Sequence, residues 1–325
     1  MAPRIFITGV SGYIAGQLAT DLSKQHPEWQ LVGLVRNDDQ AQKIAARLPA
    51  IQTVLGDLSS HAILMREAEK ADVVIQAADC DDAALVKTLI KGLAQGGKGG
   101  SFIQISGAAS IADAPNGYGQ PSSKVYDDVE DIAEITTFDP THLHWEADQA
   151  VLHEGQALGV KTAILVPTMV YGDGEGPVKT KSMTIPWLVD AIVKRGKGFT
   201  VGEGKSAWAG VHVKDLSVAI ILILENALTS DGGKAVWGSE GVYYVEEGEY
   251  AFADIVPKLV ESLKSRGMIK CLDIDQVSTE EATRINPYSL LIWGANVRCR
   301  ATRLRALGWQ PTQQTLYELI ASGTC

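Results

Sequence analysis

The chain has 325 residues, of which 46% are apolar and 6% aromatic, so it is long enough to bury a large core. Its formal net charge of −10 argues against nucleic acid or an anionic membrane surface as the main partner. No apolar run reaches the roughly 18 residues that cross a bilayer, and the sequence begins without a signal-peptide pattern. We therefore expect a cytoplasmic protein.

Short strands alternate with helical patterns in the first half of the chain. Runs rich in Val, Ile and Leu predict buried strands at 4–8, 30–35, 51–55, 72–77, 101–106 and 161–166. Amphipathic stretches between them, such as 13–25 and 81–95, predict helices. This alternation predicts an α/β fold built on a doubly wound parallel sheet with helices on both faces.

The rhythm changes after Val170. A segment rich in Gly, Pro and Lys at 171–183 precedes a helical pattern at 185–195, and 209–228 returns to a strand followed by a helix. One more strand is expected at 241–247. The predicted division is a nucleotide-binding domain and a smaller mixed α/β substrate lobe, over residues 1–170 with about 211–235, and 171–210 with 236–325.

The segment ITGVSGYIAGQL lies between the first strand and the first helix, where a glycine fingerprint indicates a Rossmann-type dinucleotide site. Gly9 would permit the tight turn, Gly12 would let a pyrophosphate approach the backbone, and Ala15 takes the third small position. The helix N-terminus would offer free N–H groups to the diphosphate. The other residues expected to contact the cofactor here are Ser11, Tyr13 and Ile14. The alternative is a glycine-rich turn without a ligand.

The end of the second strand bears on the choice of dinucleotide. Val35 stands where an acid would hold the ribose 2′-hydroxyl of NAD, and Arg36 follows it. Since a guanidinium pairs well with a phosphate, NADP is the predicted cofactor and NAD the second choice. Asp38 and Asp39 would either repel that phosphate or cap the next helix. The alternative for Arg36 is a solvated surface residue.

Six short motifs, in the expected order, resemble the extended short-chain dehydrogenase/reductases of the NAD(P)-dependent epimerase/dehydratase type. They are TGVSGYIA, GDL (56–58), QAAD, PTMVYG (167–172), VHVKDL (211–216) and LRALGWQPT (304–312). The resemblance implies that the cofactor is lined by Asp57 and Leu58 near the adenine, by Ala77 and Ala78, and by Pro167, Thr168 and Met169 near the nicotinamide. It also suggests a homodimer formed through helices at about 81–97 and 140–158.

The proton-transfer residues of that family are missing. Its members use a Ser, Tyr and Lys set, in which the tyrosine acts as acid or base. Alignment backward from PTMVYG places Asp148 at the family's glutamate, His144 at the lysine and Pro140 at the tyrosine. None of the nine tyrosines has a lysine four residues later, so this would be an atypical member. Ser106 is a candidate serine, but the usual register puts Gly107 at the catalytic position.

Three side chains are candidates for catalysis: His144, Tyr118 and Ser106. His144 has the ordinary pKa for acid/base work at neutral pH, or it contacts the cofactor ribose in place of the lysine. Tyr118 would donate a phenol proton from the segment after the fifth strand, or pack on its own loop. Cys80 is expected to be a small buried hydrophobe. With Cys271, Cys299 and Cys325 it forms no CxxC pair, so we expect reduced thiols and no metal.

Three functions are compatible with these observations. The leading prediction is an NADP(H)-dependent oxidoreductase that acts on a small carbonyl or hydroxy metabolite with a non-standard proton donor. The second is a catalytically silent NADP-binding sensor or scaffold, and the third is a redox-neutral isomerase, cyclase or lyase. Lys179 and Lys181 would gather an anionic substrate or form a solvated charge run, and Asp215 is expected to cap the helix that follows it.

Overall fold

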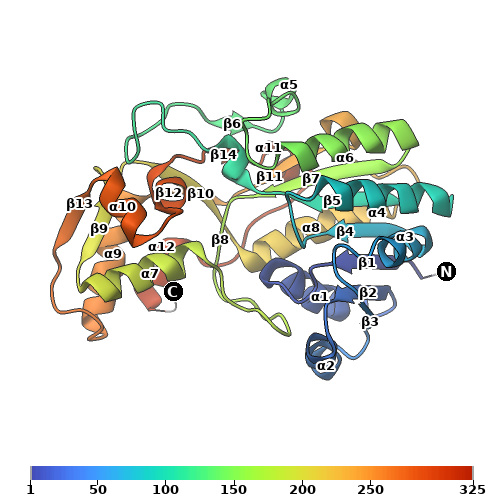
Figure 1. The fold of residues 1–325 in the computed structure, drawn as a ribbon, viewed down its shortest axis with the longest axis horizontal. Coiled ribbons are helices and arrows are strands. Elements are labelled where there is room, and N and C mark those ends of the chain that lie inside the picture. The colour runs from blue at the N-terminus through green and yellow to red at the C-terminus, as the bar shows by residue number, and fades with distance from the viewer. Residues whose placement is uncertain (1, 324–325) are drawn as a thin grey trace.

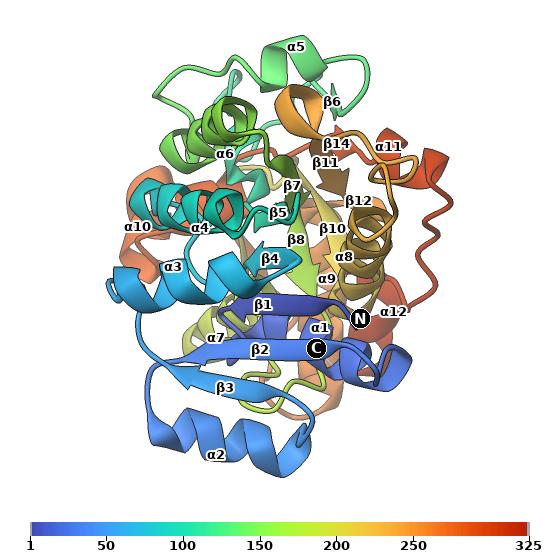
Figure 2. The same cartoon turned by 90° about the vertical axis from the view of Figure 1, so that its right-hand side faces the viewer.

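A computed structural model describes residues 2–323, so Cys325 lies outside the described residues (Figures 1 and 2). Its centre is a sheet of seven parallel strands in the order β11-β7-β5-β4-β1-β2-β3. The strands are β1 (Arg4–Thr8), β2 (Gln30–Val35), β3 (Gln52–Leu55), β4 (Val73–Gln76), β5 (Ser101–Ile105), β7 (Lys161–Pro167) and β11 (Val242–Val245). This order confirms the predicted doubly wound sheet of the Rossmann type.

Helices cover both faces of the sheet. They are α1 (Tyr13–Gln25), α2 (Asp38–Arg47), α3 (His61–Lys70), α4 (Ala83–Gly96), α6 (Trp145–Leu158) and α8 (Val213–Ala227). Helix α4 packs between α3 and α6 on one face, and α1 packs against α8 on the other. Because successive strand residues point to opposite faces, Phe6 belongs to one apolar core, whereas Ile5 and Ile7 belong to the second.

The rest of the chain forms smaller sheets and the helices around them. The strands are β6 (Tyr126–Asp127), β8 (Met169–Tyr171), β9 (Gly198–Val201), β10 (Ala207–His212), β12 (Gly248–Ala251), β13 (Ile274–Val277) and β14 (Cys299–Arg300). The helices are α5 (Ile132–Ile135), α7 (Thr184–Arg195), α9 (Phe252–Ser265), α10 (Thr279–Ile285), α11 (Thr302–Ala306) and α12 (Leu316–Ser322), with short turns η1 (Ala108–Ile111), η2 (Gly238–Glu240) and η3 (Leu290–Gly294). Among the helices of residues 2–323, none is long and apolar enough to span a membrane.

One strand lies elsewhere than predicted. We expected residues 236–325 to belong to the smaller lobe, but β11 pairs in parallel with β7 in the main sheet. Its four residues, VYYV, are all buried, which suits a strand covered on both faces. Leu304 and Trp309 also join the apolar core of that sheet. The other domain boundaries stay a prediction.

Asp215 does not cap its helix. His212 is the N-cap of α8, where its ring accepts a hydrogen bond from the backbone N–H of Lys214. The Asp215 carboxylate instead accepts from the backbone N–H groups of Thr312 (2.9 Å) and Gln313 (3.0 Å). The carboxylate therefore ties the C-terminal segment to the first turn of α8.

Candidate functional site

A cavity of about 490 Å³ opens at the carboxyl ends of the first strands of the sheet. Eight of the residues predicted to bind the cofactor line it: Gly9, Ser11, Gly12, Arg36, Asp57, Leu58, Ala77 and Ala78. Its other lining residues are Leu34, Gln40, Ser59, Val178 and Lys179. The crevice outside the carboxyl ends of parallel strands is where α/β sheets of this type bind ligands.

The turn between β1 and α1 forms one wall of this cavity. Gly9 has φ +74°, and a Cβ there would lie 2.4 Å from the carbonyl oxygen of Ala77, so only glycine fits against the end of β4. Gly12 is the N-cap of α1 and brings no capping side chain. The N-terminus of α1 therefore starts at the cavity wall, where its partial positive charge suits a diphosphate.

Arg36 lies on the cavity wall, apart from the acids that follow it. Asn37 caps α2, with its side chain accepting from the backbone N–H of Gln40 at 3.0 Å. Asp38 and Asp39 occupy the first turn of that helix, and Asp39 pairs with Lys43 at 2.7 Å. Across residues 2–323, the ion pairs do not include Arg36. Its guanidinium is therefore available to an anionic ligand.

Asp57 holds the turn after β3 in shape. Its Oδ1 accepts from the hydroxyls of Ser59 (2.7 Å) and Ser60 (2.9 Å) and from the backbone N–H of Ser59. The bond from Ser59 is the main cause that lowers the pKa of Asp57, followed by that from Ser60. The carboxylate is thus ionised and oriented, and Oδ2 is left to a ligand such as the predicted adenine.

Six residues predicted to touch the cofactor are not among the lining residues: Tyr13, Ile14, His144, Pro167, Thr168 and Met169. The Tyr13 hydroxyl donates to the carbonyls of Tyr171 (3.0 Å) and Gly172 (2.5 Å). Met169 is buried in β8, Ile14 packs against the main core, and Pro167 pairs with Val245 in the main sheet. Their cofactor contacts stay predictions.

A second cavity, of about 370 Å³, lies beyond β5. Its wall is made by Ala109, Ser110, Ala112, Asp113, Ala114, Tyr118, Thr141, His142, Leu143, Leu291 and Ala295. Tyr118 is 42% exposed there, which leaves its phenol accessible to a small molecule. The His142 ring stacks on Phe138 and its Nδ1 lies 2.6 Å from the Ser110 carbonyl oxygen, so His142 is held as part of the wall.

His144 has an unusual backbone. It is the only residue other than glycine with positive φ (+66°) among residues 2–323, and it directly precedes α6. The helix expected from residue 140 therefore begins at Trp145. The left-handed conformation is uncommon for a residue with a Cβ, and such residues concentrate at functional sites. It turns the imidazole toward the loop after β4.

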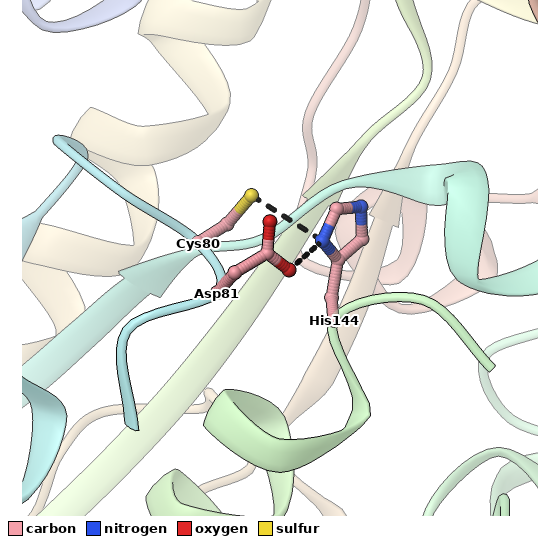
Figure 3. Close-up of side chains that lie close together, drawn as sticks. All are labelled: Cys80, Asp81 and His144. Atoms are coloured by element: carbon pink, nitrogen blue, oxygen red, sulfur yellow. Dashed lines mark hydrogen bonds and ion pairs between the residues drawn. The ribbon is translucent and has the colours of Figure 1, made fainter. Parts of the chain in front are cut away.

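The His144 ring faces two side chains of that loop (Figure 3). Its Nδ1 lies 2.7 Å from Asp81 Oδ1 and 3.4 Å from Cys80 Sγ. A Cβ at Gly107 would come within 2.8 Å of Nε2. The missing side chain at Gly107, where the family's serine is expected, thus leaves the space that the imidazole occupies.

The pairing with Asp81 determines what His144 can do. One ring nitrogen cannot donate and accept at once, so a Nδ1–H that donates to Asp81 leaves Nε2 free to take up or release a proton. The imidazole is 13% exposed and the Asp81 carboxylate 64%, so the pair reaches solvent on its acidic side. A carboxylate that orients a histidine in this way is the arrangement of a general base.

Cys80, Asp81 and His144 also offer one donor atom each to a metal, within 4.8 Å of one another. Burial, and then the charge of Asp81, raise the pKa of the Cys80 thiol to about 12. A structural zinc site takes four ligands, whereas this cluster supplies three donor atoms. The cluster therefore fits a histidine–carboxylate pair better than a metal centre.

The Ser106 hydroxyl is hydrogen-bonded to the carboxyl group of Asp148. Its hydroxyl donates to Asp148 Oδ2 at 2.8 Å, and Asp148 Oδ1 is buried without a hydrogen-bond partner among residues 2–323. Burial raises the pKa of Asp148 to about 7, although the bond from Ser106 opposes the shift. The Ser106 hydroxyl is therefore engaged by Asp148, and its predicted catalytic role stays a prediction.

The sequence did not indicate several of the lining residues, nor the partner of His144. Gln40 lines the first cavity, but it lies inside an ordinary helical pattern. Asp81 is one of three acids in the run from Asp79 to Asp82, and their spacing does not single out the one that meets His144. The pair becomes visible only in the folded structure, because its two residues are 63 positions apart in the sequence.

Fold and cavity together define a nucleotide-binding protein of the Rossmann class. The family model described as the NAD dependent epimerase/dehydratase family matches residues 5–236. The chain belongs to this family. The chain is 31% identical to a protein of Acremonium sp. named oxidase ucsJ, over 96% of this chain and 93% of that protein. An uncharacterized protein of Saccharomyces cerevisiae is 27% identical over 98% of this chain and 97% of its own.

Solved structures agree on the fold. A dTDP-glucose 4,6-dehydratase of Bacillus anthracis, in complex with NAD, has a TM-score of 0.69 at 16% identity, covering 99% of this chain and 96% of that one. A UDP-N-acetylglucosamine 4-epimerase of Methanobrevibacter ruminantium has the same TM-score at 14% identity, with 99% and 97% covered. The family, described as NAD dependent, supports a nicotinamide dinucleotide as cofactor.

Proposed function

We propose that this chain is an NADP(H)-dependent oxidoreductase that acts on a small carbonyl or hydroxy metabolite. The observation that carries the proposal is the His144–Asp81 pair, with His144 at the family's lysine position. The cavity predicted to hold the cofactor is lined by eight of the expected residues. The relative named an oxidase also favours redox chemistry. Both halves of the site, cofactor binding and proton transfer, are then present.

The proposed chemistry assigns the chain a narrow task. A bound nicotinamide supplies or accepts the hydride. In the reducing direction, the imidazolium form of His144 gives its Nε2 proton to the alkoxide oxygen as that charge develops, and Asp81 orients the ring. Oxidation runs the same steps in reverse, with neutral Nε2 as the base. Tyr118 lines the second cavity, where its phenol would orient the substrate oxygen.

The choice of NADP rests on Arg36. Its guanidinium lines the cavity without an ion pair among residues 2–323, and Val35 leaves no carboxylate at the end of β2 to hold a ribose 2′-hydroxyl. We expect NADPH to bind at least tenfold more tightly than NADH, which corresponds to about 1.4 kcal/mol. Fluorescence titration of both cofactors measures the ratio.

Arg36→Ala tests the cause of that preference. It should weaken NADPH binding about tenfold or more and leave NADH within twofold. Arg66→Ala, which removes an exposed arginine of α3, is the matched control and should change neither. Equal affinity for both cofactors in the unaltered protein would refute the choice of NADP.

Deuterium transfer tests the reaction class. Incubation with a panel of aliphatic and aromatic aldehydes and ketones and NADPH labelled at C4 should place one deuterium in the product. His144→Ala and Asp81→Asn should each lower the rate by two orders of magnitude or more, with cofactor affinity unchanged. Equal losses of rate and affinity in His144→Ala would reduce the histidine to a ribose contact. Turnover without NADPH oxidation would favour a redox-neutral isomerase, cyclase or lyase instead.

A further inference from the structure

The segment between β8 and α7, residues 172–183, lies against the nucleotide-binding domain; we name it the strap. Figure 1 shows this loop leaving the end of β8 and running beneath α1 toward α2. Its residues Val178 and Lys179 line the cofactor cavity together with Arg36. The strap thus brings side chains to the cofactor that the glycine fingerprint does not contain.

Backbone contacts hold the strap against α1. The Tyr13 hydroxyl donates to the carbonyl of Gly172 at 2.5 Å, and Gln17 Oε1 accepts from the backbone N–H of Glu175 at 2.6 Å. A Cβ at Gly176 would lie 3.0 Å from the carbonyl carbon of Gly16, so the two glycines let the backbones approach closely. The strap is therefore positioned before any ligand arrives.

Ion pairs also attach the strap to its neighbouring helices. The Glu175 carboxylate pairs with Lys214 at 2.5 Å and with Lys24 at 2.9 Å. The hydrogen bond from Lys214, then that from Lys24, lowers the pKa of Glu175 to about 2. Arg47 of α2 donates to the carbonyl of Gly176 at 3.3 Å. Although each exposed pair is weak, together they tie the strap to three helices.

The two lysines of the strap differ in their surroundings. Lys181 pairs with both oxygens of Asp173 at 2.6 Å. Across residues 2–323, the ion pairs do not include Lys179. The acid on the cavity wall is Asp57, whose Oδ1 is already occupied by Ser59 and Ser60. Arg36 and Lys179 therefore give the cavity an excess of positive charge, in a chain of net charge −10.

We infer that Lys179 is a second specificity-determining residue, which binds the 2′-phosphate of NADP(H) opposite Arg36. The inference rests on the proposed function. Gly176 lies against α1 and accepts from Arg47 at the end of α2, so the strap crosses from the first helix to the second. Its Lys179 lines the same cavity as Arg36 and Gln40. The diphosphate already has the N-terminus of α1, whereas two cations from separate segments suit a dianionic phosphate ester.

The test compares the two strap lysines. Lys179→Ala should weaken NADPH binding about fivefold or more, leave NADH within twofold, and reduce the salt dependence of NADPH binding. Lys181→Ala, in the same segment but paired with Asp173, should change neither affinity. The shorter probes 2′,5′-ADP and 5′-AMP should repeat this split, because they differ only in the 2′-phosphate.

Each contrary outcome is distinct. Equal losses for NADPH and NADH in Lys179→Ala would assign the lysine to the diphosphate and overturn the inference. Unchanged affinity for both cofactors would make Lys179 a solvated surface residue and overturn it too. If Arg36→Ala abolishes the NADPH preference while Lys179→Ala does not touch it, only this inference fails. If the unaltered protein does not prefer NADPH, the proposed cofactor fails first.

Discussion

Replacing Asp148 by Asn tests whether the carboxyl beneath the site carries a proton at neutral pH. Asp148 lies in the first turn of α6, accepts from Ser106 through Oδ2, and has a buried Oδ1 without a partner among residues 2–323. Burial raises its pKa from 3.8 to about 7. An ionised carboxylate here is poorly compensated, so the folded state holds the proton more tightly than the unfolded chain does.

The direction of the pH effect follows from this shift. A raised pKa stabilises the folded state fully below pH 3.8, and the stabilisation is lost as the pH rises toward 7. The shift from 3.8 to about 7 corresponds to about 4 kcal/mol of unfolding free energy, lost at about 1.4 kcal/mol per pH unit. An asparagine side chain cannot ionise, so the Asp148→Asn variant should lack this loss.

Urea unfolding from pH 4.5 to 8, followed by tryptophan fluorescence, measures the difference. The unfolding free energy of the original chain minus that of Asp148→Asn should fall steadily with pH up to about 7 and then level off. Glu146→Gln, an exposed acid on the same helix, is the control and should give a nearly flat difference. A flat or rising difference for Asp148→Asn would refute the argument from burial.

Two further substitutions test the walls of the site. Gly9→Ala should lose NADPH binding and about 1–2 kcal/mol or more of stability, because its φ is +74° and its Cβ meets Ala77. The control Gly97→Ala, with φ +64° and open space around it, should cost stability without affecting cofactor binding. Calorimetry measures the stability and titration the binding. Cys80→Ser should leave the pH–rate profile unchanged, since Asp81 orients His144. Stoichiometric zinc binding that this variant loses would instead support a metal centre.

Local patterns predicted residues that the fold brings around one cavity, although their binding of the cofactor stays a prediction. The fingerprint from Gly9 to Ala15 lies within one turn, and its steric demands follow from spacing alone, so strand, turn and helix form where expected. Arg36 was identifiable because it directly follows a strand end. The family and the parallel sheet were therefore within reach of the sequence.

Pairings between residues far apart in the sequence could not be predicted. Asp81 meets His144 across 63 residues, and nothing in the run of acids around it indicates which one does so. The helix expected from residue 140 begins at Trp145, because His144 leaves the helical region of φ. The strap was visible only as a segment rich in Gly, Pro and Lys, since its attachment to α1 depends on tertiary contacts. The homodimer suggested by the family stays a prediction.

The residues that differ from the family's catalytic set contact one another. These contacts bear on whether the residues for proton transfer were lost or replaced. A serine at 107 would place its Cβ 2.8 Å from the imidazole nitrogen of His144, so the glycine there makes room for this position of the ring. Asp81 then supplies the carboxylate that an isolated histidine would lack. A silent scaffold needs neither the space at Gly107 nor an oriented Nδ1, and an uncommon left-handed backbone at His144 would serve no purpose in it. Mutual accommodation of three residues from three loops therefore favours a substituted proton donor over a vestigial site.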